Sequence, residues 1–318
     1  MADSANTTVR SDLERCEELA HSHYENFAVG SWLLPRSARG ALAAIYAVVR
    51  IADDMADEEE TGTAPAERAR AIREWEKALL DAVNGGDAPH WALRACAAEI
   101  RRHDLDVRCF QSLFRAFARD TEPVRYANFE DLLGYCRDSA NPVGRLVIQL
   151  LDPTVARDPL ALEASDAICT GLQLLNHWQD VAEDAQRGRI YLPEEERSRF
   201  GVDENTLLAG HDSAELRSLL SFEVARARAL LESGDGLVAR SRGRLRLESA
   251  LFRRAGLVGC DVLSEAGFAV MGGAPRIPRR RRLWGVGHGI LDALSSRRSR
   301  LRSTLPLPTA RPGASESP

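Results

Sequence analysis

The sequence lacks the features of a secreted, zinc-binding or membrane-spanning protein. Its six cysteines include no pair separated by two residues, and none lies at zinc-finger spacing from a histidine, so neither a disulfide framework nor a zinc site is indicated. No stretch reaches the roughly 18 apolar residues that cross a bilayer, and the polar, acidic N-terminus is unlike a signal peptide. We therefore expect a cytoplasmic protein whose thiols are reduced and buried.

Aromatic residues and strand-forming patterns are also scarce. Aromatics make up 6% of the 318 residues, and no sustained run of β-branched residues has the period of two that is typical of strands. Alanine, leucine, arginine and glutamate are abundant instead, which favours helices. The formal net charge of −5 gives no reason to expect nucleic acid as a partner. An all-α protein is therefore predicted.

Helix signals follow one another along the chain. Ser11 with Glu14 fits a capping box, Pro65 suits a first helical turn, and Asn128 and Asp203 suit the N-cap position. The apolar periodicity predicts helices over residues 11–23, 35–58, 65–83, 90–103, 106–120, 128–151, 158–185 and 213–239. We predict a flexible N-terminus over residues 1–10, one helical domain over 11–273 and a basic, largely disordered tail over 274–318.

The tail differs from the domain in composition. Residues 274–318 hold ten arginines and two acidic residues. Four consecutive arginines precede a set of apolar residues, and together they suggest a short basic amphipathic segment: Arg279 to Arg282, then Leu283, Trp284, Val286, Ile290, Leu291 and Leu294. Such a segment can lie on an anionic membrane surface, which would give the protein a peripheral position on the inner face of the membrane. A solvated tail without a role is the equally open alternative.

Two acidic clusters carry the strongest chemical signal. Asp53 and Asp57 are four residues apart near the end of an apolar helix, and Asp180 and Asp184 repeat that spacing. Like charges at this spacing share a helix face and repel, so a compensating cation is indicated. Mg²⁺ is commonly held by one or two carboxylates together with substrate phosphates. A single cluster is more often a solvated helix end, but two clusters of matching spacing favour a site for several Mg²⁺ ions and a diphosphate.

Three further side chains lie close to the clusters in sequence. Arg50 precedes Asp53 by three residues, and Arg189 and Tyr191 follow Asp184 closely, so each could reach the same diphosphate. Taken singly, a surface ion pair, a loop cation and a packing ring are the plainer interpretations.

The order and spacing of these motifs resemble the squalene/phytoene synthase family. Residues 46–57 resemble its first aspartate-rich motif, and residues 171–191 resemble its second. Tyr135 and Cys136, with residues 142–144, resemble the central helix motif between them. The resemblance covers roughly residues 15–272. It implies a single-domain isoprenoid-synthase helical fold around a central apolar cavity, and a magnesium-dependent enzyme that acts on a long isoprenoid diphosphate.

The resemblance also assigns roles to individual positions. It implies that the Mg²⁺–diphosphate cluster is held by Asp53, Asp57, Asn176, Asp180 and Asp184. It implies that substrate is contacted by Tyr46, Arg50, Gln173, Arg189 and Tyr191, with His23, Tyr24 and Asn26 in a polar segment beside the diphosphate.

Departures from the usual family pattern point to one branch. Residues 23–35 and 139–144 resemble the bacterial HpnC branch, which accompanies hopanoid biosynthesis. Asp138 stands where the family usually has a tyrosine associated with condensing two farnesyl diphosphates, and Gln179 stands where an arginine is common. The resemblance therefore implies an enzyme that ionises presqualene diphosphate and lets water capture the rearranged cation, giving hydroxysqualene. Sibling enzymes of that pathway are expected partners, and NADPH is not expected, in line with the missing dinucleotide motif.

Several alternatives stay open at this point. Asp138 could deprotonate the attacking water, or it could pair with Arg137, Arg145 or another cation. The chain could instead be a head-to-head synthase that makes presqualene diphosphate, squalene or phytoene. A non-catalytic assembly factor of the same fold is disfavoured by the intact acidic motifs, and a terpene cyclase is disfavoured because its second motif differs from the Asp180 and Asp184 pair.

Overall fold

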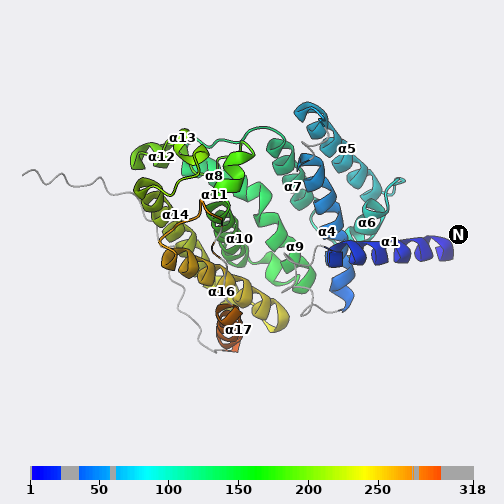
Figure 1. Ribbon diagram of the computed structural model, residues 1–318. Helices are drawn as coiled ribbons and strands as arrows, with labels where there is room; N and C mark the ends of the chain where they lie inside the picture. The colour runs from blue at the N-terminus through cyan, green and yellow to red at the C-terminus, as the bar shows by residue number, and fades with distance from the viewer. Residues whose placement is uncertain (1, 23–35, 58–61, 274, 276–278, 295–318) are drawn as a thin grey trace, which may run out of the picture.

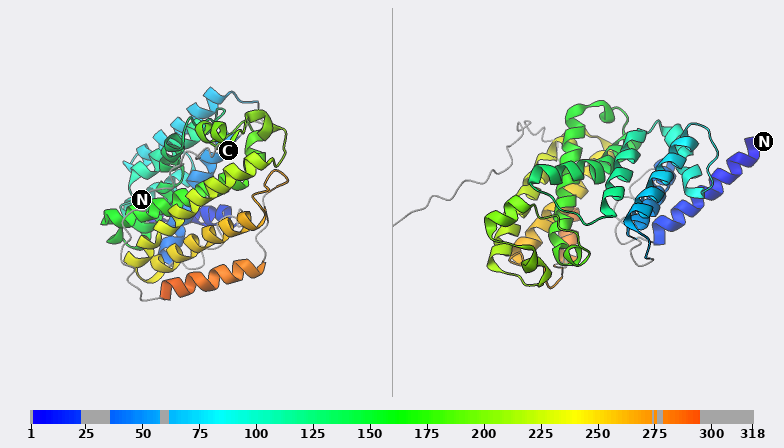
Figure 2. Two further views of the ribbon diagram at one scale, coloured as in Figure 1. Left: turned by 90° about the vertical axis from the view of Figure 1, so that its left-hand side faces the viewer. Right: turned by 90° about the horizontal axis from the view of Figure 1, so that it is seen from above.

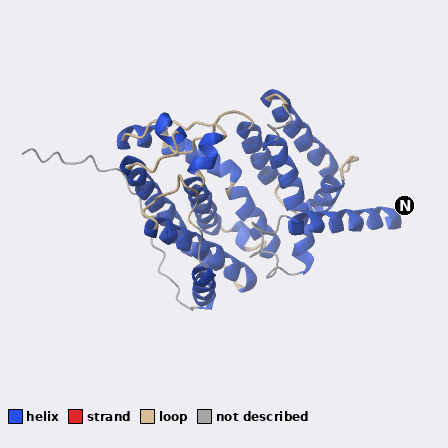
Figure 3. Cartoon of the chain, viewed as in Figure 1, coloured by secondary structure: helices blue, strands red, loops and turns tan. Residues whose placement is uncertain are grey.

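The computed structural model describes residues 2–22, 36–57, 62–273, 275 and 279–294, and every regular element within these ranges is helical (Figures 1 and 3). The elements are α1 (Ala2–Ser22), α4 (Arg36–Asp57), α5 (Pro65–Val83), α6 (Trp91–His103), α7 (Val107–Asp120), α8 (Phe129–Ser139), α9 (Asn141–Leu151), the short 3₁₀ helix η2 (Val155–Arg157), α10 (Pro159–Gln179), α11 (Val181–Gln186), α12 (Glu194–Phe200), α13 (Glu204–Leu208), α14 (Ala214–Ser233), α15 (Asp235–Arg240), α16 (Gly243–Glu265) and α17 (Arg279–Leu294). The all-α prediction is confirmed. No helix in these ranges is both long enough and apolar enough to cross a membrane.

Local signals account for many of the helix ends. Helix α5 begins at Pro65 and ends at Val83, as predicted, because proline fits the first turn and Gly85 follows with a positive φ of 92°. The side chain of Asn128 accepts a hydrogen bond from the backbone of Asp131 at 3.0 Å, and Asp203 caps α13 in the same way. Both predicted N-caps are therefore confirmed.

Three predicted long helices are divided in the structure. The predicted helix over residues 128–151 breaks at Ala140, because Pro142 has no N–H to continue the ladder and begins α9 instead. The predicted helix over 158–185 breaks at Asp180, whose φ of −102° and ψ of 15° end α10 and start α11. The predicted helix over 213–239 breaks at Gly234. Glycine at this position allows close packing against α10, since a Cβ there would lie 2.2 Å from Ile168 Cγ1.

The N-terminal end of the chain differs from the sequence expectation, whereas the helix near the other end coincides with the predicted amphipathic segment. Helix α1 begins at Ala2, so most of the stretch predicted to be flexible is helical and Ser11 lies inside the helix. Asp12 helps to hold α1, because its buried carboxylate pairs with Arg94 of α6 at 2.8 Å. At the other end α17 forms within the predicted tail and packs against α16.

The core has two hydrophobic clusters. The first is formed mainly by α1 and α4 to α7 around Trp75, Phe110 and Phe114. The second is formed mainly by α8 to α16 around Trp178 and Leu231. Helices α10, α14 and α16 pack against one another at the centre of this second cluster, and Figure 2 shows the two halves from two further sides. The acidic motif of α4 belongs to the first half and that of α10 and α11 to the second.

Candidate functional site

The first acidic motif occupies the last turn and a half of α4. Ala52 and Ala56 are buried in the first cluster, and Asp53 and Asp57, which directly follow them, keep 40% and 45% of their side chains exposed. Although Asp53 is partly exposed, loss of water around its carboxyl and the nearby Asp57 charge raise its pKa to about 6. The two aspartates therefore form an anionic site that the protein neutralises incompletely.

Arg50 lies one turn before these aspartates. Its guanidinium is 2.6 Å from Asp54 Oδ1 and 3.5 Å from Asp53 Oδ2. The half-buried Tyr46 ring lies a further turn back, close enough for the Arg50 charge to oppose the effect of burial, which raises the pKa of Tyr46. The predicted set from α4 therefore gathers along one side of its last three turns.

The second acidic motif keeps its spacing across the break at Asp180. The backbone N–H of Asp184 donates to the carbonyl of Asp180 at 2.8 Å, so the two carboxylates remain one helical turn apart. Asp184 Oδ2 lies 3.9 Å from Nδ1 of His177. The Nε2 atom of the same ring is 3.2 Å from Gln173 Nε2, and Asn176 is exposed on the same turn of α10. Loss of water, followed by the Asp184 charge, raises the pKa of Asp180.

Arg189 joins the two motifs. Its backbone N–H donates to the Asp184 carbonyl at 2.8 Å, while its Nη2 donates to Asp57 Oδ1 at 2.6 Å and to the Asp120 carbonyl at 3.2 Å. Burial lowers the pKa of this guanidinium, but the hydrogen bond and charge of Asp57 outweigh that effect and hold the pKa above its usual value. Arg189 thus connects Asp57 of the first motif, through its side chain, with Asp184 of the second, through its backbone, although the two aspartates are more than a hundred residues apart in sequence.

A buried polar and aromatic layer lies beneath Arg189. The Tyr191 and His177 rings stack with centroids 3.5 Å apart, and Tyr135 lies 5.6 Å from Tyr191. The Tyr135 hydroxyl donates to Asp120 Oδ2 at 2.8 Å. Burial raises the pKa of Asp120 to about 7 even though Tyr135 and Arg189 act in the opposite direction.

Sequence reasoning missed His177, Asp120 and the place of Tyr135 in this layer. Tyr135 belongs to the central motif that carried the resemblance, so a signal for it was present. His177 lies between Asn176 and Asp180 in the second motif, but the resemblance assigned it no role. Asp120 had no signal, because it is the last residue of α7 and belongs to none of the motifs that carried the resemblance.

One predicted residue is not brought to this cluster, and three others cannot be placed relative to it. Asp138, predicted either as a general base or as an ion-pair partner, forms a two-pronged pair with Arg115 of α7, with N–O distances of 2.7 and 2.9 Å. Asp138 is therefore an ion-pair partner in the structure. Its partner is Arg115 and not Arg137 or Arg145, the two arginines that the sequence suggested by name. His23, Tyr24 and Asn26 lie outside the described residues.

The aspartate pairs suit Mg²⁺ that is bound together with phosphate oxygens. They do not form a closed metal site made of protein ligands alone. Within the described ranges, no three His, Cys, Asp or Glu side chains converge as a ready metal site. The aspartates come in pairs, and Asp53 and Asp180 have raised pKa values that a nearby cation would lower. Hard oxygen pairs that are completed by phosphate oxygens match the way proteins hold Mg²⁺. Asp53, Asp57, Asn176, Asp180 and Asp184 therefore fit the group that the resemblance implies.

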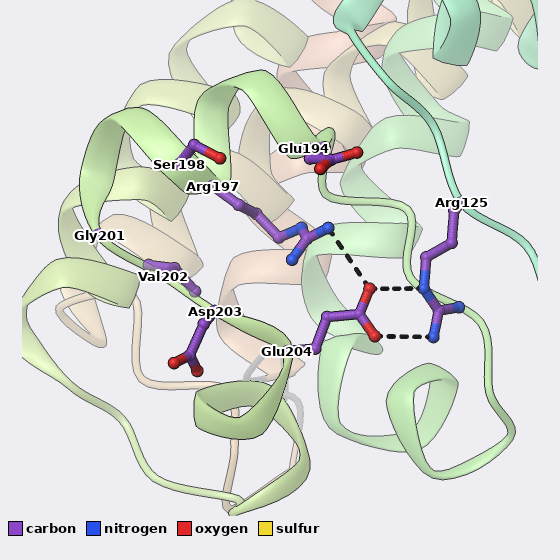
Figure 4. A pocket seen from close by; sticks show the side chains of 8 residues that line it. All are labelled: Arg125, Glu194, Arg197, Ser198, Gly201, Val202, Asp203 and Glu204. Atoms are coloured by element: carbon purple, nitrogen blue, oxygen red, sulfur yellow. Dashed lines mark hydrogen bonds and ion pairs between the residues drawn. The ribbon is translucent and has the colours of Figure 1, made fainter.

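A hollow of about 480 Å³ lies outside this cluster, beside α12 and α13 (Figure 4). Its charges are matched internally, since Glu204 accepts from Arg125 at 2.8 and 3.1 Å and lies 3.6 Å from Arg197. Arg125 also donates to the Gly188 carbonyl at 2.6 Å. This cluster therefore braces the loop that presents Arg189.

Comparisons with known proteins agree on one family. The squalene/phytoene synthase family model matches residues 20–283. The hydroxysqualene synthase of Sinorhizobium fredii is 34% identical over 226 residues, which make up 70% of this chain and 74% of that protein. The 15-cis-phytoene synthase of Synechocystis is 29% identical over 287 residues, or 87% and 83% of the two chains.

Solved structures show the same relationship. The crystal structure of squalene synthase HpnC from Alicyclobacillus acidocaldarius has a TM-score of 0.75 and 35% identity, covering 82% of this chain and 95% of that one. A dehydrosqualene synthase has a TM-score of 0.79 at 21% identity, covering 90% and 98% of the two chains. At that identity the second match supports the fold alone.

Proposed function

The chain belongs to the squalene/phytoene synthase family and is an isoprenoid-processing enzyme, and on that premise we propose that it is a hydroxysqualene synthase. The proposed reaction converts presqualene diphosphate and water to hydroxysqualene and diphosphate. The observation that carries the diphosphate chemistry is the link from Arg189 to Asp57, because it unites both acidic motifs in one site. The choice of product is supported by the relatives at 34% and 35% identity, one named hydroxysqualene synthase and the other HpnC.

Binding of the diphosphate is assigned to the rim of the site. Arg50, Arg189 and Gln173 offer N–H donors to its oxygens, and Asp53, Asp57, Asn176, Asp180 and Asp184 would hold Mg²⁺. Magnesium when bound supplies positive charge to the leaving group. Arg189 is already fixed by the Asp120 carbonyl, so its charge needs little rearrangement to stabilise the negative charge that develops on departing diphosphate.

The ionisation breaks the carbon–oxygen bond, and the electron pair leaves with diphosphate. The buried, mutually packed rings of Tyr135, Tyr191 and His177 keep water out of the layer beneath the diphosphate site, where charge interactions are stronger than in water. Burial lowers the pKa of His177, which favours the neutral ring and avoids a competing positive charge. Water forms the new carbon–oxygen bond and loses a proton, so that an alcohol results.

Product analysis tests this proposal. Purified protein given presqualene diphosphate and Mg²⁺ in ¹⁸O-labelled water should yield hydroxysqualene carrying the label, with or without NADPH. Farnesyl diphosphate alone should yield little product. Direct conversion of farnesyl diphosphate to squalene or phytoene would overturn the proposal in favour of a head-to-head synthase. That function is the main alternative, because a phytoene synthase is similar over 87% of this chain.

A further inference from the structure

Helix α17 is held against α16 through two glycines. Gly285 and Gly289 are both buried. A Cβ atom at Gly289 would lie 2.8 Å from Leu251 Cδ2, and one at Gly285 would lie 3.1 Å from Val258 Cγ2. The backbone of α17 therefore packs directly on the apolar side chains of α16, and the glycine side of α17 is buried in this contact.

Ion pairs fix the helix at both ends of this contact. Arg281 near the start of α17 pairs with Glu265 of α16. Asp292, the single acidic residue of α17, pairs with Arg254, and Arg253 lies 3.7 Å away. The negative charge of the helix is thus turned toward α16 and neutralised there.

The opposite side of α17 is apolar and exposed. Val286, Ile290, Leu291 and Leu294 follow helical spacing and are 44%, 40%, 61% and 75% exposed. The described part of the chain has eight large hydrophobic residues with comparable exposure, and half of them lie on this one helix. Scattered exposed leucines need no explanation, but such a concentration marks an interaction surface.

Arginines precede and follow the apolar stripe in the sequence. Helix α17 opens with four arginines, Arg279 to Arg282. The sequence immediately after it adds Arg297, Arg298, Arg300 and Arg302, with no acidic residue among residues 295–302. An apolar stripe flanked by arginines matches an anionic bilayer, whose headgroups attract arginine while its acyl boundary accepts apolar side chains.

We propose that the outer face of α17, formed by Val286, Ile290, Leu291 and Leu294, docks on the surface of an anionic phospholipid bilayer, with the arginine-rich sequence on either side of this stripe supplying the charge attraction. Figure 2 shows α17, in orange, along one edge of the molecule, where its packing contacts are with α16. A second copy of the chain fits this face poorly. Four side chains fall far short of the roughly 800 Å² per partner that stable interfaces bury, and two arginine-rich faces repel each other.

Vesicle co-sedimentation of the full-length protein tests the proposal without using enzyme turnover. The protein should bind vesicles in which half of the lipid is phosphatidylglycerol, and should bind pure phosphatidylcholine vesicles much more weakly. Raising the salt from about 0.05 M to about 0.5 M should weaken binding because the lipid charge is screened. Leu291→Glu should weaken binding about tenfold or more, because a leucine contact is lost and a like charge is introduced.

Leu160→Glu is the matched control. Leu160 is 52% exposed on α10, away from the stripe, so the variant adds the same charge and should bind vesicles like the parent protein. Thermal melting by circular dichroism checks that both variants are folded. Equal binding to the two lipids, or unchanged binding by Leu291→Glu, would overturn the proposal. So would a dimer in light scattering that Leu291→Glu dissociates while the parent protein ignores vesicles.

Discussion

Arg189 Nη2 lies 2.6 Å from Asp57 Oδ1, although the two residues are 132 positions apart in the sequence. Arg189 is held more firmly than Asp57, with 13% of its side chain exposed against 45%. In our proposal, Asp57 would turn toward the metal when magnesium diphosphate binds, while Arg189 would stay in place for the phosphate oxygens. The pair thus offsets part of the negative charge of the free site and would become part of the bound one.

Removing the Arg189 charge is expected to damage catalysis more than folding. Arg189→Gln should lower kcat/KM for presqualene diphosphate by about 100-fold or more, as losing a group that stabilises transition-state charge commonly does. Arg187→Gln is the matched control, because Arg187 is an exposed arginine two residues away whose pair with Glu183 lies at the surface. Comparable losses in both variants would contradict a specific role for Arg189.

The aspartate pairs are expected to act together through magnesium. Asp57→Asn and Asp180→Asn should each lower turnover by about 100-fold or more, with normal helical circular dichroism. Chelation by EDTA should abolish turnover, and added Mg²⁺ should restore it. Glu183→Gln, which removes an exposed carboxylate from the same acidic cluster, should change turnover little. Near-full activity of both asparagine variants, or full activity in EDTA, would defeat the magnesium assignment.

Asp120 is expected to make stability depend on pH. Its pKa of about 7 in the folded protein lies above its ordinary value of 3.8, so folding favours the protonated form. The resulting stabilisation is complete below about pH 4 and is lost as the pH rises through about 7. The asparagine in Asp120→Asn stays neutral and can still accept the Tyr135 hydrogen bond. Between about pH 4 and about pH 8, the free energy of unfolding of this variant should therefore rise above that of the parent protein, by roughly 1–4 kcal/mol at the upper end.

Melting temperatures across that pH range measure this effect. The difference between Asp120→Asn and the parent protein should widen as the pH rises from about 4 to about 7 and then level off. Asp131→Asn, which changes an exposed carboxylate on α8, should show a nearly constant difference. A constant difference for Asp120→Asn as well would mean that its carboxyl ionises normally in the folded protein.

Asp138 is expected to behave as an ion-pair partner of Arg115. Asp138→Asn and Arg115→Gln should each cost up to about 1 kcal/mol of stability, as exposed pairs do, and the double variant should cost little more than either one. Hydroxysqualene yield should stay within about twofold of the parent protein, since general-base catalysis is commonly worth far more than that. A large loss of alcohol confined to Asp138→Asn would restore the general-base hypothesis.

The contact between α16 and α17 offers a paired glycine test. Gly289→Leu should loosen α17, because even a Cβ there meets Leu251 at 2.8 Å, and overpacking typically costs about 1–3 kcal/mol. Gly287→Leu is the control on the same helix, since a Cβ at that position meets nothing within 4 Å. Trypsin should cut the arginines of α17 faster only in Gly289→Leu. Equal cleavage of both variants would show that the glycine contact does not hold the helix.

The sequence by itself determined the helical class, several helix ends and the spacing of the aspartate pairs. Pro65, Asn128 and Asp203 act on their immediate neighbours, so their effect can be read without a fold. The same holds for the aspartate pairs, because four-residue spacing on a helix fixes their separation. By contrast, α16 was not predicted: it buries side chains against α10, α14 and α17, so it shows no single apolar stripe.

Only the tertiary structure decided which distant groups meet. The bonds from Arg189 to Asp57 and from Tyr135 to Asp120 depend on how α4, α7, α8 and the loop after α11 pack. The pairing of Asp138 with Arg115 was likewise one of several choices that sequence left open. The sequence predicted disorder for most of the tail. The α17 segment instead packs on α16, because Gly285 and Gly289 allow the two helices to approach closely. Local signals act over a turn or two of helix, whereas contacts between distant segments depend on the packing of the whole chain.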